Sequence, residues 1–223
     1  MRILLALLAL FTLGAAKPVD WTKVVTRTAA GSYVIGKPTA KVRLVEFMSY
    51  TCPHCAEFTT EATAPLMRDY VARGTVAFEL RNAVRDPLDL AASLATRCGP
   101  AARFPGNHEA VFAAQAQLFE GASKFDPAPT ANDPIAGLKA MSRASGLTAL
   151  MTKRGVPAAA VDACLASKVA QAPVLAMTND AWNVRKIGGT PAFYLNGKRI
   201  EAHHWAEVEA LLRTALKLKP KAG

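Results

Sequence analysis

The sequence predicts an α/β fold in which a small mixed sheet, flanked by helices, receives an all-helical insertion. Two apolar, strand-like runs lie on either side of a helical pattern early in the chain, and an Asn-Gly hairpin signal followed by an amphipathic helix ends it. Between these parts, from Asp86 to Lys186, the pattern is helical almost throughout. With 223 residues, 51% of them hydrophobic, the chain has enough apolar material for one sizeable core.

The first residues have the layout of a secretory signal peptide. Arg2 is followed by an apolar stretch from Ile3 to Leu13 and by small residues that end at Ala16. This stretch is too short to span a bilayer, which takes about 20 apolar residues. We therefore expect residues 1–16 to be cleaved and the remaining protein to be exported to the periplasm in soluble form.

The net charge of +10 does not point to a nucleic-acid partner. Lys and Arg are spread along the chain, and aromatic residues make up only 7% of it. A nucleic-acid surface would gather basic residues on one face and interleave them with aromatic ones. We expect a solvated basic surface and no nucleic-acid binding.

The early part of the chain predicts a strand-helix-strand unit. Residues 17–40 suggest short edge strands joined by turns. The run Val42–Met48 predicts a central strand covered on both faces, and a helix follows Cys52 with a break near Pro65. A second strand, Thr75–Leu80, would pair with the first in parallel through a right-handed crossover.

The late part of the chain predicts an antiparallel hairpin and a last helix. The Asn-Gly pair at 196–197 has the residue types of a tight hairpin turn, and Trp205–Leu216 has apolar residues on one helical face. We expect residues 17–83 and 184–223 to form one domain around the sheet, with residues 84–183 as the helical insertion.

The motif Cys52-Pro53-His54-Cys55 has the features of a redox-active dithiol. Cys52 lies at a predicted helix N-terminus, where unpaired backbone N–H groups and the helix dipole stabilise an anion, and His54 adds positive charge. Pro53 presets the backbone of the first turn. Cys55 lies one turn further in and is shielded, so Cys52 is the expected attacking thiolate and Cys55 the resolving thiol.

The motif is also compatible with haem attachment, a structural zinc site or an inert disulfide, and these are weaker interpretations. Haem attachment is disfavoured because Ala56, and not a histidine, follows the second cysteine. A structural zinc site would need a second close pair of cysteines, whereas Cys98 and Cys164 are far apart in the chain. Zinc binding and an inert disulfide therefore remain as the weaker alternatives.

Three residues outside the motif are candidates for the same site. Glu46 lies inside the predicted central strand, and as a buried acid of raised pKa it would move the proton of Cys55; the alternative is an acid that reaches solvent or pairs with a base. Thr190 and Pro191 open the hairpin strand, where an X-Pro bond is the realistic place for a cis peptide.

The stretches VEFMSYTCPHC and GGTPAFYLNG, separated by a long helical interruption, resemble the DsbA-like thiol:disulfide oxidoreductases of the thioredoxin superfamily. The resemblance covers nearly the whole mature chain. It implies a thioredoxin fold with a helical insertion, with Cys52 as nucleophile, Cys55 as resolving thiol, His54 as the residue that destabilises the disulfide, Pro191 as cis and Glu46 as the buried acid.

The resemblance also implies a function and its partners. The protein would introduce disulfide bonds into reduced, unfolded exported polypeptides and be reoxidised by a membrane quinone-linked protein, with its redox-active disulfide as the only cofactor and no metal. Thr190 stands where the best-known DsbA proteins resemble one another in having Val, and Thr is familiar from the disulfide-isomerase relatives. An isomerase or reductase, or a non-catalytic module that binds unfolded chains or zinc, is the alternative. Residues 17–40 are too few for a dimerisation domain, so a monomer is expected.

The remaining cysteines and histidines receive structural interpretations. Cys98 and Cys164 are expected to form a disulfide that clamps the helical insertion, with two buried free thiols as the alternative. His108, His203 and His204 have no metal-ligand spacing and are expected at the surface or at helix caps.

Overall fold

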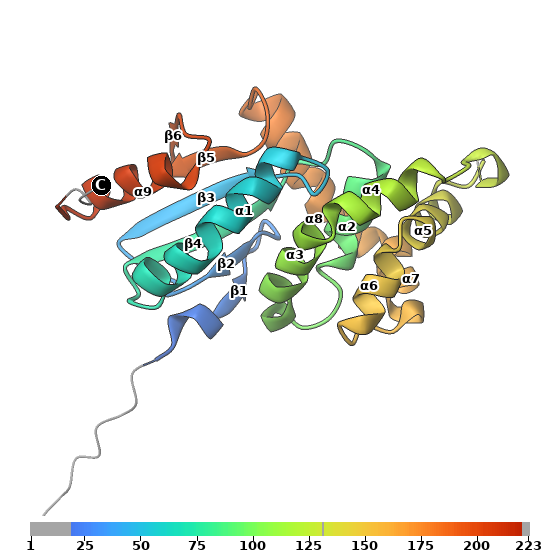
Figure 1. The fold of residues 1–223 in the computed structure, drawn as a ribbon, viewed down its shortest axis with the longest axis horizontal. Helices are drawn as coiled ribbons and strands as arrows, with labels where there is room; N and C mark the ends of the chain where they lie inside the picture. The colour runs from blue at the N-terminus through green and yellow to red at the C-terminus, as the bar shows by residue number, and fades with distance from the viewer. Residues whose placement is uncertain (1–18, 131, 220–223) are drawn as a thin grey trace, which may run out of the picture.

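The computed structural model describes residues 19–130 and 132–219. The predicted signal peptide, residues 1–16, lies outside the described residues. Among the described residues, the strands form one six-stranded sheet in the order β1-β2-β4-β3-β5-β6 (Figure 1). The strands are β1 Val25–Arg27, β2 Tyr33–Ile35, β3 Val42–Met48, β4 Val76–Asn82, β5 Ala192–Leu195 and β6 Lys198–Ile200.

The centre of the sheet is the predicted strand-helix-strand unit. Strands β3 and β4 pair in parallel, and every other pairing in the sheet is antiparallel. Between them run helix α1, Pro53–Leu66, and one π-helical turn, Met67–Val71. Pro65 lies in the last turn of α1, next to the place where the regular helix gives way, as the sequence predicted.

The alternation of side chains along β3 decides what lies beneath α1. Leu44 and Met48 belong to the larger hydrophobic cluster, which includes the buried face of α1, whereas Val45 and Phe47 belong to a second cluster. Because successive side chains of a strand point to opposite faces, Glu46 lies on the α1 side, with Leu44 and Met48. The single acid of the central strand is therefore placed under the helix that begins at the dithiol.

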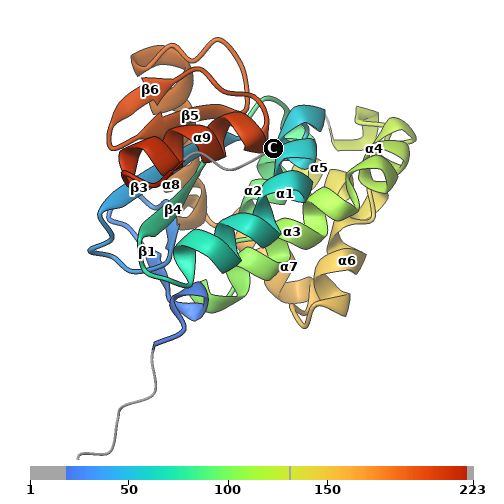
Figure 2. The same ribbon diagram turned by 60° about the vertical axis from the view of Figure 1, so that its left-hand side comes forward.

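The helical insertion packs beside the sheet (Figures 1 and 2). After β5 and β6, helix α9, Trp205–Ala215, lies on the same face of the sheet as α1, and the π-helical turn Asp180–Val184, which follows α8, contributes Ala181 to the second cluster on the opposite face. The insertion helices are α2 Pro87–Ala95, α3 Phe104–Ala113, α4 Gln115–Ser123, α5 Pro134–Ala144, α6 Leu147–Lys153, α7 Ala158–Ala166 and α8 Lys168–Asn179. The domain boundaries at 83/84 and 183/184 stay a prediction.

One hydrophobic core joins the insertion to the sheet. The larger cluster runs without interruption from β3 and α1 into helices α2 to α8, with Phe104, Leu147 and Leu165 among its fully buried members. The predicted hairpin also forms: Asn196 and Gly197 have φ values of 49° and 83°, the positive values that a tight turn between β5 and β6 requires. The insertion is therefore packed as an extension of the core.

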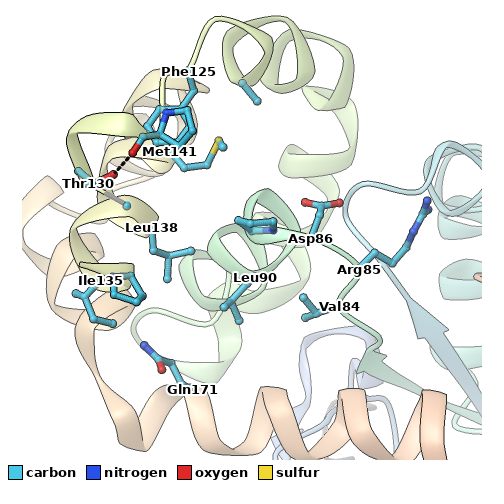
Figure 3. A pocket seen from close by; sticks show the side chains of 15 residues that line it. Val84, Arg85, Asp86, Leu90, Phe125, Thr130, Ile135, Leu138, Met141 and Gln171 are labelled. Carbon is cyan, nitrogen blue, oxygen red and sulfur yellow. Dashed lines mark hydrogen bonds between the residues drawn. The ribbon is translucent and has the colours of Figure 1, made fainter. Parts of the chain in front are cut away.

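A pocket of about 800 Å³ opens within the insertion, among α2, α5, α8 and the connection between α4 and α5 (Figure 3). Among the described residues, no single helix is both long and apolar enough to cross a membrane. Within residues 19–130 and 132–219, one bent pair of helices, Ala158–Ala166 and Lys168–Val184, reaches that length and composition when its two parts are taken together, with an angle of 61° between them.

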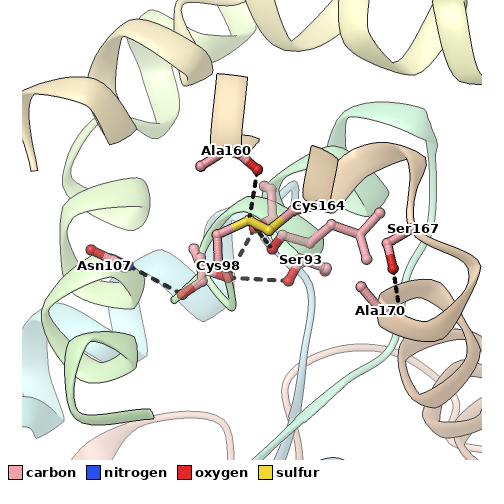
Figure 4. The surroundings of a disulfide bond; sticks show 10 residues. Ser93, Cys98, Asn107, Ala160, Cys164, Ser167 and Ala170 are labelled. Atoms are coloured by element: carbon pink, nitrogen blue, oxygen red, sulfur yellow. Dashed lines mark hydrogen bonds between the residues drawn. A yellow bond between two sulfur atoms is a disulfide. The ribbon is translucent and has the colours of Figure 1, made fainter. Parts of the chain in front are cut away.

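Cys98 and Cys164 are joined by a disulfide (Figure 4). The bond connects the segment that follows α2 to helix α7, and the two Cα atoms are 6.1 Å apart. Cys98 is buried in the main core, and Cys164 is partly buried against it. The expected clamp across the insertion is present in the structure.

Replacing both Cys98 and Cys164 by Ala should lower the free energy of unfolding by about 4 kcal/mol, because the bond closes a loop of 66 residues and so restricts the unfolded chain. Urea unfolding followed by circular dichroism measures the difference. Both proteins should carry Cys52→Ser, so that thiol exchange does not occur during the experiment. A loss below about 1 kcal/mol would show that the crosslink adds little restriction.

Candidate active site

The dithiol lies where β3 ends and α1 begins. Cys52 is the N-cap residue of α1, with the extended backbone angles φ −96° and ψ 118°, and Pro53 is the first helical residue. The fixed φ of proline suits the first turn and removes an N–H group that would have no partner there. Cys52 and Cys55 are both free thiols in this structure, which is therefore the reduced form.

The Cys52 sulfur is held as an anion. Its pKa is lowered from 9.0 to about 5, first by a hydrogen bond from the Cys55 thiol, against burial, which raises it. Thr190 and the backbone N–H groups of Cys55 and His54 lower it further. These N–H groups belong to the first turn of α1 and have no partner within the helix, so an anion at its N-terminus takes their place.

Cys55 has the opposite character. It is fully buried, and burial raises the pKa of its thiol well above 9.0. The hydrogen bond that Cys55 donates to Cys52 raises this pKa further, as does the charge of Glu46. One turn of helix thus separates a thiolate from a thiol that keeps its proton.

His54 acts through its backbone more than through its ring. The imidazole is 73% exposed, and its Nδ1 lies 3.1 Å from Oε2 of Glu57, one helical turn later. The prediction assigned the ring a positive charge near the sulfur. In the structure the identified contribution of His54 to the Cys52 thiolate is its backbone N–H.

Glu46 is buried beside the two cysteines. Burial raises its pKa to about 8, and the charge of Cys52 adds to this shift. Its Oε1 atom has no hydrogen-bond partner among the described residues, and it borders a cavity of about 10 Å³ that Thr59 and His108 also line. Such a cavity holds about one water molecule. Glu46 is therefore protonated at neutral pH, and it lies close enough to both sulfurs to interact with them electrostatically.

Thr190 and Pro191, directly before β5, meet the dithiol from the strand next to β3. Their peptide bond is cis, and the Thr190 carbonyl oxygen is 3.0 Å from the Cys52 sulfur. The Thr190 hydroxyl is buried beside the Cys52 sulfur. Next to it, His54, Arg199 and His203 line a cavity of about 320 Å³.

Residues of the insertion fix the turn that presents Cys52, and sequence reasoning missed them. Gln115 of α4 donates its side-chain N–H groups to the carbonyl oxygens of Tyr50 and Cys52, at 2.8 and 3.0 Å. Asp89 of α2 accepts the N–H of Tyr50 at 2.8 Å. Asp86, the N-cap of α2, accepts the hydroxyl of Thr51. The Asp86-Pro87 start signal of α2 was visible in the sequence, but nothing local connected it to the dithiol.

One of the three histidines is not where the sequence suggested. His108 is buried, its Nδ1 lies 3.2 Å from the Tyr50 hydroxyl, and burial lowers its pKa to about 3. Its neighbours Phe104 and Phe112 on α3 turn this face of the helix into the core, which is why the surface interpretation was wrong. His203 is exposed and His204 is the N-cap of α9, as expected.

Among residues 19–130 and 132–219, no group of three or more His, Cys, Asp or Glu side chains is arranged to hold a metal ion. The groups that gather around the motif are instead two thiols, one buried carboxyl group and backbone dipoles. This set of groups is suited to moving protons and exchanging disulfides.

The fold and this dithiol site define a thioredoxin-type protein, and comparisons with known proteins agree. Residues 28–214 match the family model described as "Thioredoxin". The chain therefore belongs to the thioredoxin family, and the predicted thioredoxin fold is confirmed.

Particular relatives of this chain are named as protein-disulfide enzymes. The chain is 33% identical to the protein-disulfide isomerase of Novosphingobium aromaticivorans. The crystal structure of that protein superposes on this one with a TM-score of 0.77, and the match covers 83% of this chain and 97% of the isomerase chain. The oxidised BdbD of Bacillus subtilis shares the fold, with a TM-score of 0.58, 21% identity and coverage of 82% and 92%. The DsbA-like resemblance stated from the sequence is confirmed.

A curated relative is longer than this chain. The Rickettsia prowazekii protein named "Putative protein-disulfide oxidoreductase RP025" is 26% identical over 196 residues, which are 87% of this chain and 65% of that protein. This chain thus spans just under two thirds of that relative.

Removing the thiol of Cys55 should raise the pKa of Cys52, because the hydrogen bond from Cys55 is the largest cause of its shift. The ultraviolet absorbance of the thiolate should titrate near pH 5 in the reduced protein and at higher pH in Cys55→Ala, with Cys52→Ser as the blank. The free energy of unfolding of the reduced protein should also fall as the pH is lowered from 9.0 towards 5. The pKa of Cys52 is lower in the folded state than in the unfolded state, so ionisation of Cys52 favours folding, and this contribution is lost when the folded protein takes up the proton. An unchanged midpoint in Cys55→Ala would contradict this account.

Gln115→Met should lower the free energy of unfolding by about 1–3 kcal/mol, because it leaves the buried carbonyls of Tyr50 and Cys52 without their donor at similar side-chain volume. The matched control is Gln117→Met, on the exposed face of the same helix, which should change it little. Equal effects of the two substitutions in urea unfolding would show that Gln115 does not hold the turn.

Proposed function

We propose that this thiol:disulfide oxidoreductase of DsbA type is exported to the periplasm, where it introduces disulfide bonds into reduced, unfolded polypeptides through the Cys52–Cys55 pair. The observation that carries the proposal is the division of the two thiols: the pKa of Cys52 is about 5, and that of Cys55 is well above 9.0. A sulfur that is stable as a thiolate is a good leaving group, so Cys52 is readily released from a mixed disulfide with a substrate.

The reaction proceeds in two exchanges. A substrate thiolate attacks Cys52 of the oxidised pair; a substrate–Cys52 disulfide forms, and Cys55 leaves as a thiolate that takes up a proton. A second substrate thiolate then attacks its own sulfur in the mixed disulfide, and Cys52 leaves as the stabilised thiolate. The substrate loses two electrons, and the dithiol gains them.

Glu46 supplies the proton that Cys55 needs when it leaves. The carboxyl group is protonated at neutral pH and lies within electrostatic range of both sulfurs. General acid–base assistance of this kind contributes about 10²-fold or more. On reoxidation the proton returns from Cys55 to Glu46, and the electrons pass to a membrane quinone-linked partner.

Export is supported by the first 16 residues and by the disulfide between Cys98 and Cys164, because such bonds persist in oxidising compartments. An isomerase is the second candidate, since the 33% identical relative carries that name and Thr190 lies against the Cys52 sulfur. No observation favours a zinc-binding or non-catalytic module. We also propose that the protein is a monomer.

The test follows regain of activity by a reduced, unfolded substrate that needs disulfides, with a scrambled form of the same substrate in parallel. The oxidised protein should reactivate the reduced form within one exchange cycle, and Cys52→Ser should abolish this. Glu46→Gln should slow the step about 10²-fold or more. Reactivation of the scrambled form alone would assign the isomerase function instead.

A further inference from the structure

The pocket within the insertion is apolar and large enough for a peptide segment. We call it the insertion pocket. It has a volume of about 800 Å³, within the range of about 300–1,000 Å³ that binding sites for organic ligands occupy. Figure 3 shows side chains from different elements facing a shared space, and the apolar ones are Leu90, Phe125, Ile135, Leu138 and Met141.

The insertion pocket borders the turn that leads to Cys52. Val84, Arg85 and Asp86 form one of its walls, directly after β4. The Asp86 carboxylate accepts a hydrogen bond from the hydroxyl of Thr51, the residue immediately before Cys52. The wall of the pocket therefore touches the turn that presents the reacting sulfur.

We propose that the insertion pocket binds apolar side chains of the polypeptide that is joined to Cys52 in the mixed disulfide. This inference rests on the proposed function and adds a determinant of substrate choice to it. A polypeptide whose cysteines are still reduced has not buried its apolar residues, so it can offer them to a pocket. Once the substrate is joined to Cys52, a neighbouring segment reaches the pocket at high effective concentration.

The cavity beside Thr190 and Pro191 is less suited to this role. It has about 320 Å³, and Arg199, His54 and His203 are among its lining residues. The insertion pocket offers more than twice that volume behind a mainly apolar surface. The two cavities lie on different parts of the fold, one beside the hairpin and one in the insertion.

The test compares two dithiol peptides that differ at one position a few residues from a cysteine, with Leu in one and Ser in the other. The wild-type protein should oxidise the Leu peptide with a kcat/KM about tenfold higher, the effect of burying one apolar side chain. Ile135→Lys and Met141→Lys, which place a charge on partly buried walls of the pocket, should remove the preference. Val169→Lys, on the exposed face of α8, is the matched control and should keep it.

Reduction of the Cys52–Cys55 disulfide by dithiothreitol separates this inference from the proposed function. All variants should react with dithiothreitol at the wild-type rate, and Ile135→Ala provides a milder substitution if a lysine variant does not fold. Equal kcat/KM for the two peptides in the wild type, or a preference that survives in Ile135→Lys and Ile135→Ala, would overturn the inference while the function stands. Failure to oxidise either peptide would overturn the function itself. Self-association that Ile135→Lys abolishes would assign the pocket to a second copy of the chain and overturn the inference.

Discussion

The turn formed by residues 49–52 is the constraint on which the site depends. A hydrogen bond to Asp89 and two from Gln115 hold its backbone from the side of the insertion. They fix the point at which α1 begins, and so the direction in which its free N–H groups face the Cys52 sulfur. The thiolate is stabilised by this placement and by Cys55, while the ring of His54 is turned towards solvent.

Two buried glutamates on neighbouring strands show how strongly environment decides the charge of a side chain. Glu79 on β4 is also buried, but hydrogen bonds from Arg43, Ser32 and Arg81 outweigh burial and lower its pKa. Glu46 on β3 has one oxygen without a hydrogen-bond partner in the described part of the chain, and its pKa is raised. The register pairs Val45, not Glu46, with Glu79, so the two acids lie on opposite faces. One face therefore holds a structural ion network and the other an acid that keeps its proton.

Sequence reasoning reached the features that local pattern determines. The apolar run with one acid predicted the central strand, the Asn-Gly pair predicted the hairpin, and the two-cysteine motif predicted the helix start at Cys52. It did not reach Gln115 or the interior position of His108, because these depend on how α3 and α4 pack against the turn, and spacing along one helix carries no such information. The placement of His54 differed for a similar reason, since a flexible, exposed side chain is free to choose its partner.

The uninterrupted core between sheet and insertion has a mechanical consequence. With side chains such as Phe104 and Leu94 shared between the two parts, a hinge opening between them would expose apolar surface to water. Motions that leave this packing intact are confined to the periphery, so the sheet and the insertion move together as one rigid body. A partner chain must then adapt its own shape to a rigid platform, and an unfolded chain is the kind of partner that can do so.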